Sequence, residues 1–280
     1  MDTDDPQLPQ GALRLHLRTP TLPPATATNT LILGGSRLVV IEPATPHAGD
    51  RARLDDALAA LAAEGRSVEA ILLTHHHADH IGYAEPLAQR LGVPIIAHAD
   101  TMDRVAFAVD ETWEDGQRLD LGEGFVVEAV HTPGHAPGHL VYYEHKTRLA
   151  YAGDMVAGQG TILIDPEDGG DMSQYLDSLR RLGALGAHAL VPSHGDVLDD
   201  PLGVTEHYIA HRLAREAKVV DALADGPLPM DDLLARVYAD TPTMLWPLAR
   251  RVLRAHLNKL EAEASVVCKD GVVRNTLSPV

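Results

Sequence analysis

Cysteine is almost absent from this chain of 280 residues, which has one, Cys268. A single cysteine excludes an internal disulfide and is typical of a reducing compartment, so we expect a cytoplasmic protein. No apolar run reaches the roughly 18 residues that span a membrane, and no membrane partner is expected. Residues 1–6 lack the basic segment of a secretory signal, and we expect residues 1–10 to form a disordered tail.

Positive charge is also scarce, because 23 Lys and Arg residues stand against 40 Asp and Glu residues, which gives a net charge of −17. The stretch from Thr205 to Val280 carries ten basic and ten acidic residues, so the whole excess of acid lies before it. A strongly acidic body repels phosphodiester polymers at long range, which disfavours nucleic acid as a partner. We therefore expect a small-molecule substrate.

Histidine, in contrast, is concentrated in the stretch 75–80, which reads HHHADH. An apolar run at 68–73 precedes it and predicts a buried strand, and helical apolar spacing follows over 81–91. The stretch therefore occupies a turn between a strand and a helix. Such a turn at the end of a strand is where open α/β sheets place their sites.

Within this turn the ligand-type residues fall into two pairs. His75 and His77 stand two apart, so in extended chain their side chains point the same way, whereas His76 points away. Asp79 and His80 lie where the chain turns. One loop could thus serve two metals, the first through His75 and His77 and the second through Asp79 and His80. The alternative is a solvated histidine-rich turn, and further ligands elsewhere decide between the two.

Three further predicted strands also end in ligand-type residues. These residues are His135 after 125–131, Asp154 after 148–153 and His194 after 187–192. Each signal is weak alone, because turns favour Gly, Pro and polar residues anyway. Together they predict one metal site at the carboxyl ends of four strands. Imidazole and carboxylate groups suit zinc, although iron and manganese accept similar sets.

The motifs H-x-H-x-D-H, H-T-P-G-H, G-D and S-H-G, in this order, resemble those of the metallo-β-lactamase superfamily. The resemblance implies an αββα sandwich that holds two divalent metal ions, zinc before iron or manganese. It assigns His75, His77 and His135 to the first metal, Asp79, His80 and His194 to the second, and Asp154 to both. It also implies a hydroxide that bridges the metals as nucleophile, with Asp79 and Asp154 as the catalytic carboxylates.

The remaining pattern before residue 200 predicts ordinary α/β elements. They are an edge strand at 12–17, a hairpin of 28–33 and 37–41, a helix over 50–63 with Asp50 as its N-cap, a strand at 138–144 and a helix over 173–185. Strands 125–131, 138–144 and 148–153 are expected to be antiparallel and linked by hairpins. We expect the catalytic domain to cover residues 11–200.

After Pro201 the character of the sequence changes. A long helix over 204–223 is followed by a helix, a second helix and a hairpin, at 230–238, 246–260 and 265–274. This order resembles a winged helix, so we expect a winged-helix-like domain over 201–280. The dipeptide T-P at 241–242 and the segment H-L-N-K-L at 256–260 resemble the β-lactamase-like protein 2 group, which is related to glyoxalase II.

The resemblance leaves more than one activity open. The leading hypothesis is a hydrolase of an ester, thioester or lactone. A β-lactam substrate is not expected, because the classical dizinc β-lactamases carry a cysteine at the second metal, whereas this chain offers Asp79. The alternatives are a metal-dependent endoribonuclease, because the group includes RNA-cleaving members, and a non-catalytic metal-binding regulator. An arginine stripe could contact nucleic acid, but we favour a solvated or salt-bridged face; it comprises Arg250, Arg251 and Arg254. The acyl group, leaving group and oligomeric state stay open.

Three features near the motifs have alternative interpretations. Glu42 stands where the superfamily usually has Asp, and either steadies the ligands or is a solvated strand end. His139 could touch substrate, support the metal ligands or pack within its strand. The segment 99–124 could line the pocket mouth through Trp113 and Met102, or form a capped loop with one buried aromatic residue.

Overall fold

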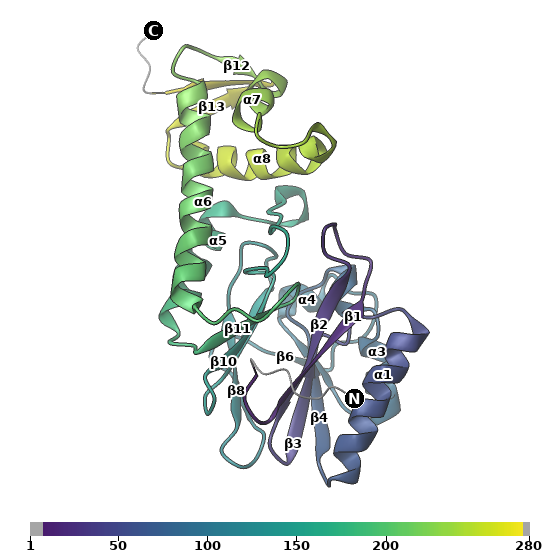
Figure 1. Ribbon diagram of the computed structural model, residues 1–280. Helices are drawn as coiled ribbons and strands as arrows, with labels where there is room; N and C mark the ends of the chain where they lie inside the picture. The colour runs from purple at the N-terminus through teal and green to yellow at the C-terminus, as the bar shows by residue number, and fades with distance from the viewer. Residues whose placement is uncertain (1–7, 277–280) are drawn as a thin grey trace.

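The computed structural model describes residues 8–276, and it consists of a two-sheet sandwich followed by a small helical domain (Figure 1). The expected tail lies outside the described residues except for its last three, and Leu8 already packs against the core. The first sheet has the order β1 (Ala12–Arg18), β2 (Ala27–Gly34), β3 (Arg37–Ile41), β4 (Ser67–Leu72), β5 (Ile95–Ala97) and β6 (Glu111–Thr112). The second has the order β11 (Ala189–Pro192), β10 (Leu149–Gly153), β9 (Leu140–Glu144), β8 (Val126–His131) and β7 (Arg118–Asp120).

Alternating strand residues build three apolar layers. One face of each sheet meets the other, and Leu31 and Leu72 pack there with Tyr142 and Val191. The outer face of the first sheet is covered by α1 (Ala48–Ala63) and α3 (Ala84–Leu91), and that of the second by α5 (Met172–Ala184). These layers confirm the αββα sandwich.

Strand directions bring the predicted ligand turns together. Strand β4 is parallel to β3 and β5, and β10 is parallel to β11, whereas β8, β9 and β10 form the predicted antiparallel hairpins. In the second sheet β8, β10 and β11 therefore run the same way. Their carboxyl ends meet the turn after β4 at one end of the sandwich.

Two local predictions were wrong in detail. Helix α1 begins at Ala48 after His47, so Asp50 lies inside its first turn instead of capping it. Asp50 is buried and accepts a hydrogen bond from Arg18 Nε at 2.7 Å. The helix expected over 81–91 is split into α2 (Ala78–Ile81) and α3, because the Tyr83 N–H donates to Pro43 O at 2.9 Å instead of continuing α2.

The C-terminal elements follow the predicted order of helix, helix and hairpin. They are α6 (Pro201–Ala222), β12 (Leu228–Pro229), α7 (Met230–Val237), η2 (Thr243–Leu245), α8 (Trp246–Ala262), β13 (Val266–Lys269) and β14 (Val272–Asn275). They enclose a separate core that includes Leu233, Leu253 and Val273. Helix α6 packs against α5, and α8 packs against α5 and the turn η1 (Pro166–Asp168). No helix in residues 8–276 is both long and apolar enough to cross a membrane.

Candidate metal centre

All seven predicted ligands lie beyond strand ends, five of them in turns and Asp79 and His80 in α2, and two glycines make the turns at His135 and Asp154 feasible. Gly134 has φ +128°, and a Cβ there would lie 2.2 Å from the Tyr175 backbone nitrogen. Gly153 has φ +56°, and a Cβ there would lie 2.3 Å from His139 Nε2. Only glycine combines these backbone angles with so close an approach. The adjacent residues, His135 and Asp154, are thereby turned into the site.

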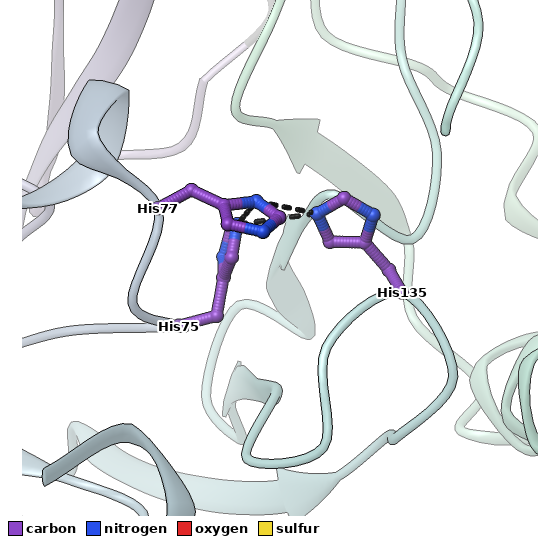
Figure 2. Close-up of side chains that lie close together, drawn as sticks. All are labelled: His75, His77 and His135. Atoms are coloured by element: carbon purple, nitrogen blue, oxygen red, sulfur yellow. Dashed lines mark hydrogen bonds between the residues drawn. The ribbon is translucent and has the colours of Figure 1, made fainter. Parts of the chain in front are cut away.

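Three histidines form the first cluster, which Figure 2 shows. His77 Nδ1 lies 2.9 Å from His75 Nε2 and 3.0 Å from His135 Nε2, and the last two atoms are 3.2 Å apart. Nitrogen ligands of a tetrahedral zinc ion, each roughly 2.0–2.1 Å from the metal, stand about 3.3 Å apart. The three rings therefore already have nearly the spacing that one cation requires.

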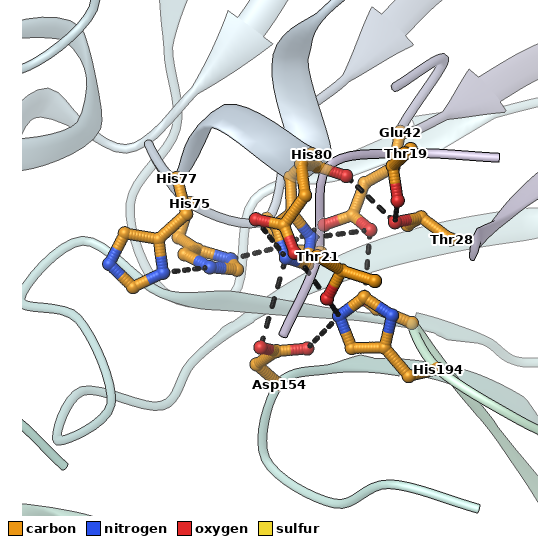
Figure 3. Close-up of polar contacts among 12 residues, drawn as sticks. Thr19, Thr21, Thr28, Glu42, His75, His77, His80, Asp154 and His194 are labelled. Atoms are coloured by element: carbon orange, nitrogen blue, oxygen red, sulfur yellow. Dashed lines mark hydrogen bonds and ion pairs between the residues drawn. The ribbon is translucent and has the colours of Figure 1, made fainter. Parts of the chain in front are cut away.

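Asp79, His80 and His194 form a second cluster that could hold a metal ion, and Asp154 lies between the two clusters (Figure 3). Asp154 Oδ2 is 3.5 Å from His135 Nε2 and 3.7 Å from His80 Nε2. Its other oxygen, Oδ1, is 3.6 Å from His194 Nε2. The structure thus brings all seven predicted residues together, with one carboxylate in contact with both groups.

In each histidine ring, a contact made by the outer nitrogen determines that the other nitrogen faces the site. A ring nitrogen that donates to an outer acceptor leaves the lone pair of the other nitrogen free to bind a cation. The outer contacts are His75 Nδ1 to Thr74 Oγ1 at 2.9 Å, His77 Nε2 to Asp168 at 2.6 Å, His80 Nδ1 to Glu42 at 2.9 Å, His135 Nδ1 to Leu163 O at 2.7 Å and His194 Nδ1 to Ala27 O at 2.9 Å. The lone pairs of the five inward-facing ring nitrogens therefore converge on the site.

His80 Nε2 and Asp154 Oδ1, which face the clusters, are among the buried side-chain atoms that have no hydrogen-bond partner in the described residues. An unsatisfied buried polar atom costs about 1–3 kcal/mol. A cation between them would relieve that cost, since both atoms are metal-ligand types. The residues present therefore fit the divalent ions that the motifs imply.

Glu42 is fully buried and organises the second cluster from behind. It accepts hydrogen bonds from Tyr151 Oη at 2.7 Å, Ser193 Oγ at 2.8 Å and Thr74 Oγ1. Burial alone would raise its pKa, but the adjacent His80 and these donors hold the pKa of Glu42 at about 2. Glu42 is therefore an ionised support of His80 and not a solvated strand end.

His139 supports the site without facing it. Burial is the main reason that its pKa falls to about 3, so the ring stays neutral. Its Nε2 accepts the Asp154 N–H at 3.1 Å, and its Nδ1 lies 2.9 Å from Thr132 Oγ1. Of the three interpretations, the structure shows a packed strand histidine that holds the Asp154 backbone.

Sequence reasoning missed Asp168, which comes from η1. Its carboxylate lies 2.6 Å from His77 Nε2 and 3.2 Å from His76 Nε2. The same carboxylate thus contacts both His76 and His77, and the three residues form a further group that could hold a metal ion. A single Asp in a Pro-Glu-Asp-Gly turn looks like any solvated turn residue, so no sequence pattern marks it.

A cavity of about 570 Å³ opens at the two clusters and extends to the C-terminal domain. Its walls come from residues 20–25, from residues 157–165 and from α6 and α8. The segment 99–124 contributes none of the lining, which corrects one of the interpretations given above. Trp113 is instead buried in the core between the sheets, where its Nε1 donates to Glu111 at 2.8 Å.

The three arginines of the stripe on α8 each make a different contact. Arg250 pairs with Asp231, Arg251 lies 2.8 Å from Asp165, and Arg254 lies 3.6 Å from Cys268 Sγ. Arg251 also lines the cavity. The stripe is therefore largely salt-bridged, as favoured above, and not a free basic face.

Comparison with known families agrees with this geometry. Residues 23–194 match the metallo-beta-lactamase superfamily, and residues 230–274 match the beta-lactamase associated winged helix domain. The chain therefore belongs to the metallo-β-lactamase superfamily, whose class is that of metal-dependent hydrolases. The boundary proposed near residue 200 lies between the two matches.

Curated relatives cover most of the chain. The beta-lactamase-like protein 2 homolog of Drosophila melanogaster is 29% identical and covers 93% of this chain, which in turn covers 91% of that protein. The atrochrysone carboxyl ACP thioesterase of Aspergillus fumigatus is 32% identical over 77% of this chain and 69% of its own length. The similarity to the Drosophila melanogaster relative thus extends over both domains.

Solved structures share the fold. A metallo-beta-lactamase family protein of Thermus thermophilus matches with a TM-score of 0.77 at 24% identity, over 95% of this chain and 98% of that chain. A beta-lactamase domain protein of Burkholderia ambifaria matches with a TM-score of 0.82 at 20% identity, over 96% and 91%. TTHA1623, solved in a di-iron-bound form, matches with a TM-score of 0.51 at 27% identity, over 65% and 94%.

Proposed function

We propose that this chain is a dinuclear metal hydrolase that cleaves an ester, thioester or lactone of a small acyl compound. The observation that carries this proposal is the convergence of five imidazole lone pairs and two carboxylates on one end of a cavity. The thioesterase name of the Aspergillus fumigatus relative supports thioesters among these three bond types.

In this proposal each predicted residue keeps its assigned role. His75, His77 and His135 would hold the first ion, Asp79, His80 and His194 would hold the second, and Asp154 would serve both. We favour zinc for this set of nitrogen and oxygen ligands. Iron and manganese are the alternatives, and the di-iron form of TTHA1623 supports iron.

Bound ions would supply Lewis acidity that lowers the pKa of water and polarises a carbonyl group. The chain itself does the rest. Asp79 and Asp154 both line the cavity, where their carboxylates can accept a hydrogen bond from the attacking water and orient it. Glu42 and His139 hold His80 and the Asp154 backbone in place from behind. The cavity walls restrict the access of bulk water.

The test is a substrate screen with metal-supplemented full-length protein. Esters, thioesters, lactones and single-stranded RNA are incubated with and without chelator, and turnover is measured. We expect chelator-sensitive cleavage of at least one acyl class and none of RNA. The Asp177→Ala variant serves as the control, because Asp177 is exposed on α5 and pairs with Arg180, away from the predicted ligands. Chelator-sensitive cleavage of RNA alone would replace this proposal with a nuclease, and tight DNA binding without turnover would replace it with a regulator.

We also propose a reducing, cytoplasmic location. Cys268, the one cysteine of the chain, has no disulfide partner. A protein without disulfides is typical of such a compartment.

A further inference from the structure

The cavity has a second polar end, which is formed by the C-terminal elements. Beyond the metal-ligand residues its walls are largely apolar, with Ile162, Leu248 and Val252 among them. The C-terminal part of the lining includes Arg212 from α6 and Tyr238 just after α7. Polar groups at both ends of a largely apolar cavity indicate a ligand with two polar parts.

Arg212 is a buried cation without a counter-ion. Its residue is 4% exposed, and no acidic side chain of residues 8–276 forms an ion pair with it. One guanidinium nitrogen donates to Ile162 O at 2.5 Å, and its Nε has no hydrogen-bond partner in the described part of the chain. A buried unpaired charge is expensive, so a guanidinium in this state favours an anion supplied from outside.

The neighbouring arginines show that the missing partner is particular to Arg212. Arg215 lies 2.8 Å from Asp240, and Arg251 lies 2.8 Å from Asp165. Both line the same cavity, and each already has its carboxylate. Of these three cavity arginines, only Arg212 has no acidic neighbour to neutralise it.

Tyr238 adds a second donor at the same end. Its hydroxyl is buried and has no hydrogen-bond partner among residues 8–276, and Arg215 stacks over its ring at 4.5 Å. Burial is the main cause that raises the pKa of Tyr238 to about 12, so the hydroxyl keeps its proton. A protonated hydroxyl and a guanidinium are both donors, which matches the acceptor oxygens of a carboxylate or phosphate.

The distance between the two ends is short. Arg212 donates to Ile162 O, and the carbonyl of the next residue, Leu163 O, lies 2.7 Å from His135 Nδ1. Arg212 and a predicted ligand therefore contact neighbouring residues of one segment. The apolar span between the ends therefore suits a chain of a few methylene groups.

We propose that Arg212 and Tyr238 form an anion subsite, and that the substrates are acyl compounds whose far end carries a carboxylate or a phosphate. This inference rests on the proposed hydrolase function and adds the substrate class to it. The scissile carbonyl lies at the metal-ligand end, a short apolar segment lies along Ile162 and Leu248, and the anion contacts Arg212. An appended domain thus selects the substrate for a site built by the sandwich.

The first experiment compares matched 4-nitrophenyl esters on metal-loaded full-length enzyme. The acyl groups are hexanoyl, 5-carboxypentanoyl and a 6-phosphooxyhexanoyl group, which distinguish neutral, carboxylate and phosphate ends. We expect kcat/KM for one of the two anionic esters to exceed that of the neutral ester by about 10-fold or more, as one charge-assisted contact provides. The anion that is preferred identifies the physiological end group.

Substitutions show which residues cause the preference for anionic esters. Arg212→Met should bring the anionic and neutral esters to within about 2-fold of each other, mainly through KM, while Arg212→Lys should keep part of the preference. Arg250→Gln is the matched control, because Arg250 is exposed, pairs with Asp231 and does not line the cavity. It should leave the preference unchanged. Tyr238→Phe should lower the preference by a smaller factor.

A binding measurement gives a readout that does not depend on turnover. Calorimetry with adipate and hexanoate, as product analogues, should show tighter binding of adipate to the wild type and equal binding to Arg212→Met. If Arg212→Met does not fold, the wild-type preference and Tyr238→Phe still decide the matter.

The outcomes separate the two proposals. If the wild type cleaves none of the esters, nor any other acyl compound of the screen, the hydrolase proposal fails. If it cleaves the neutral ester as well as both anionic esters, or if Arg212→Met keeps the full preference, the anion subsite is wrong and the hydrolase proposal stands.

Discussion

The two ends of the cavity differ in how their polar groups are satisfied. At the metal-ligand end every inward-facing ring has an outer partner, such as Glu42 for His80 or Leu163 O for His135. At the far end Arg212 and Tyr238 have buried polar atoms that no described residue satisfies. The first end is pre-organised by the sandwich, and the second is left open by the appended domain. Under the two proposals made here, bond cleavage and substrate selection are divided between two parts of the fold.

The largest effect should come from Asp154→Ala, which removes the carboxylate that contacts both clusters. Replacing residues that only support a metal site costs up to about 100-fold in activity, so we expect a greater loss than that. The fold should survive, because Asp154 lies in a turn outside the cores. Steady-state turnover and far-ultraviolet circular dichroism check this, with the exposed Asp177→Ala as control. If the turnover of Asp154→Ala stays within 10-fold of the wild type, Asp154 is not part of the metal centre.

Glu42→Gln should have the next largest effect, on metal retention. Loss of the buried charge weakens the orientation of His80, and we expect about 10- to 100-fold weaker retention in a chelator competition assay. Glu42→Asp keeps the charge, and Asp tolerates the φ of 52° found here, so it should lose less. Equal losses in both variants would mean that the charge of Glu42 plays no part.

His139→Phe should act more weakly on the same end. The phenyl ring keeps most of the buried volume but cannot accept the Asp154 N–H, which leaves that group unpaired at a cost of about 1–3 kcal/mol. We expect turnover to fall by about 10-fold. Because His139 is already neutral above its pKa of about 3, the pH profile of turnover above pH 5 should keep its shape. A displaced profile would show that His139 titrates during turnover.

The smallest effect concerns the packing of α6 on α8 behind the far end. Lys259 Nζ lies 2.7 Å from Glu216 Oε1, and His256 Nδ1 lies 3.6 Å from Oε2. Burial alone would raise the pKa of Glu216, but these two side chains hold it below 4.5. A lowered folded pKa gives stability that is present above pH 4.5 and is lost as the pH falls through the folded value.

Glu216→Gln should therefore lower the free energy of unfolding by about 1–3 kcal/mol at pH 7. The difference from the wild type should shrink as the pH falls below about 4.5, and urea unfolding at pH 7 and pH 3.5 measures it. Turnover per folded molecule should change little. A difference that grows toward low pH would show that the pair does not stabilise the fold as described.

Local spacing selected seven candidate ligands that lie close together in the structure, because each follows a strand in the sequence. The far end could not be predicted in this way. Arg212 is one of several polar residues on an amphipathic helix, and only the packing of α6 on α5 makes it buried. Asp168 reaches His77 for the same kind of reason, through a turn about ninety residues away in sequence.

Burial also decided between the two interpretations of Glu42 and between those of segment 99–124. Glu42 could be placed only by Thr74, Tyr151 and Ser193, which lie just after β4, within β10 and just after β11. Of the two interpretations of segment 99–124, the structure fits the loop with one buried aromatic residue, because Trp113 lies in the core between the sheets. Polar and aromatic residues near a motif thus indicate the approximate position of a site, whereas tertiary packing decides which of these side chains face the ligand.

Metal content tests the central claim most directly. Protein purified after metal-supplemented expression is analysed for zinc, iron and manganese, beside Asp177→Ala and Asp154→Ala. We expect about two divalent ions per chain in the wild type and in Asp177→Ala, and fewer in Asp154→Ala. A wild-type protein that holds no metal would contradict the account.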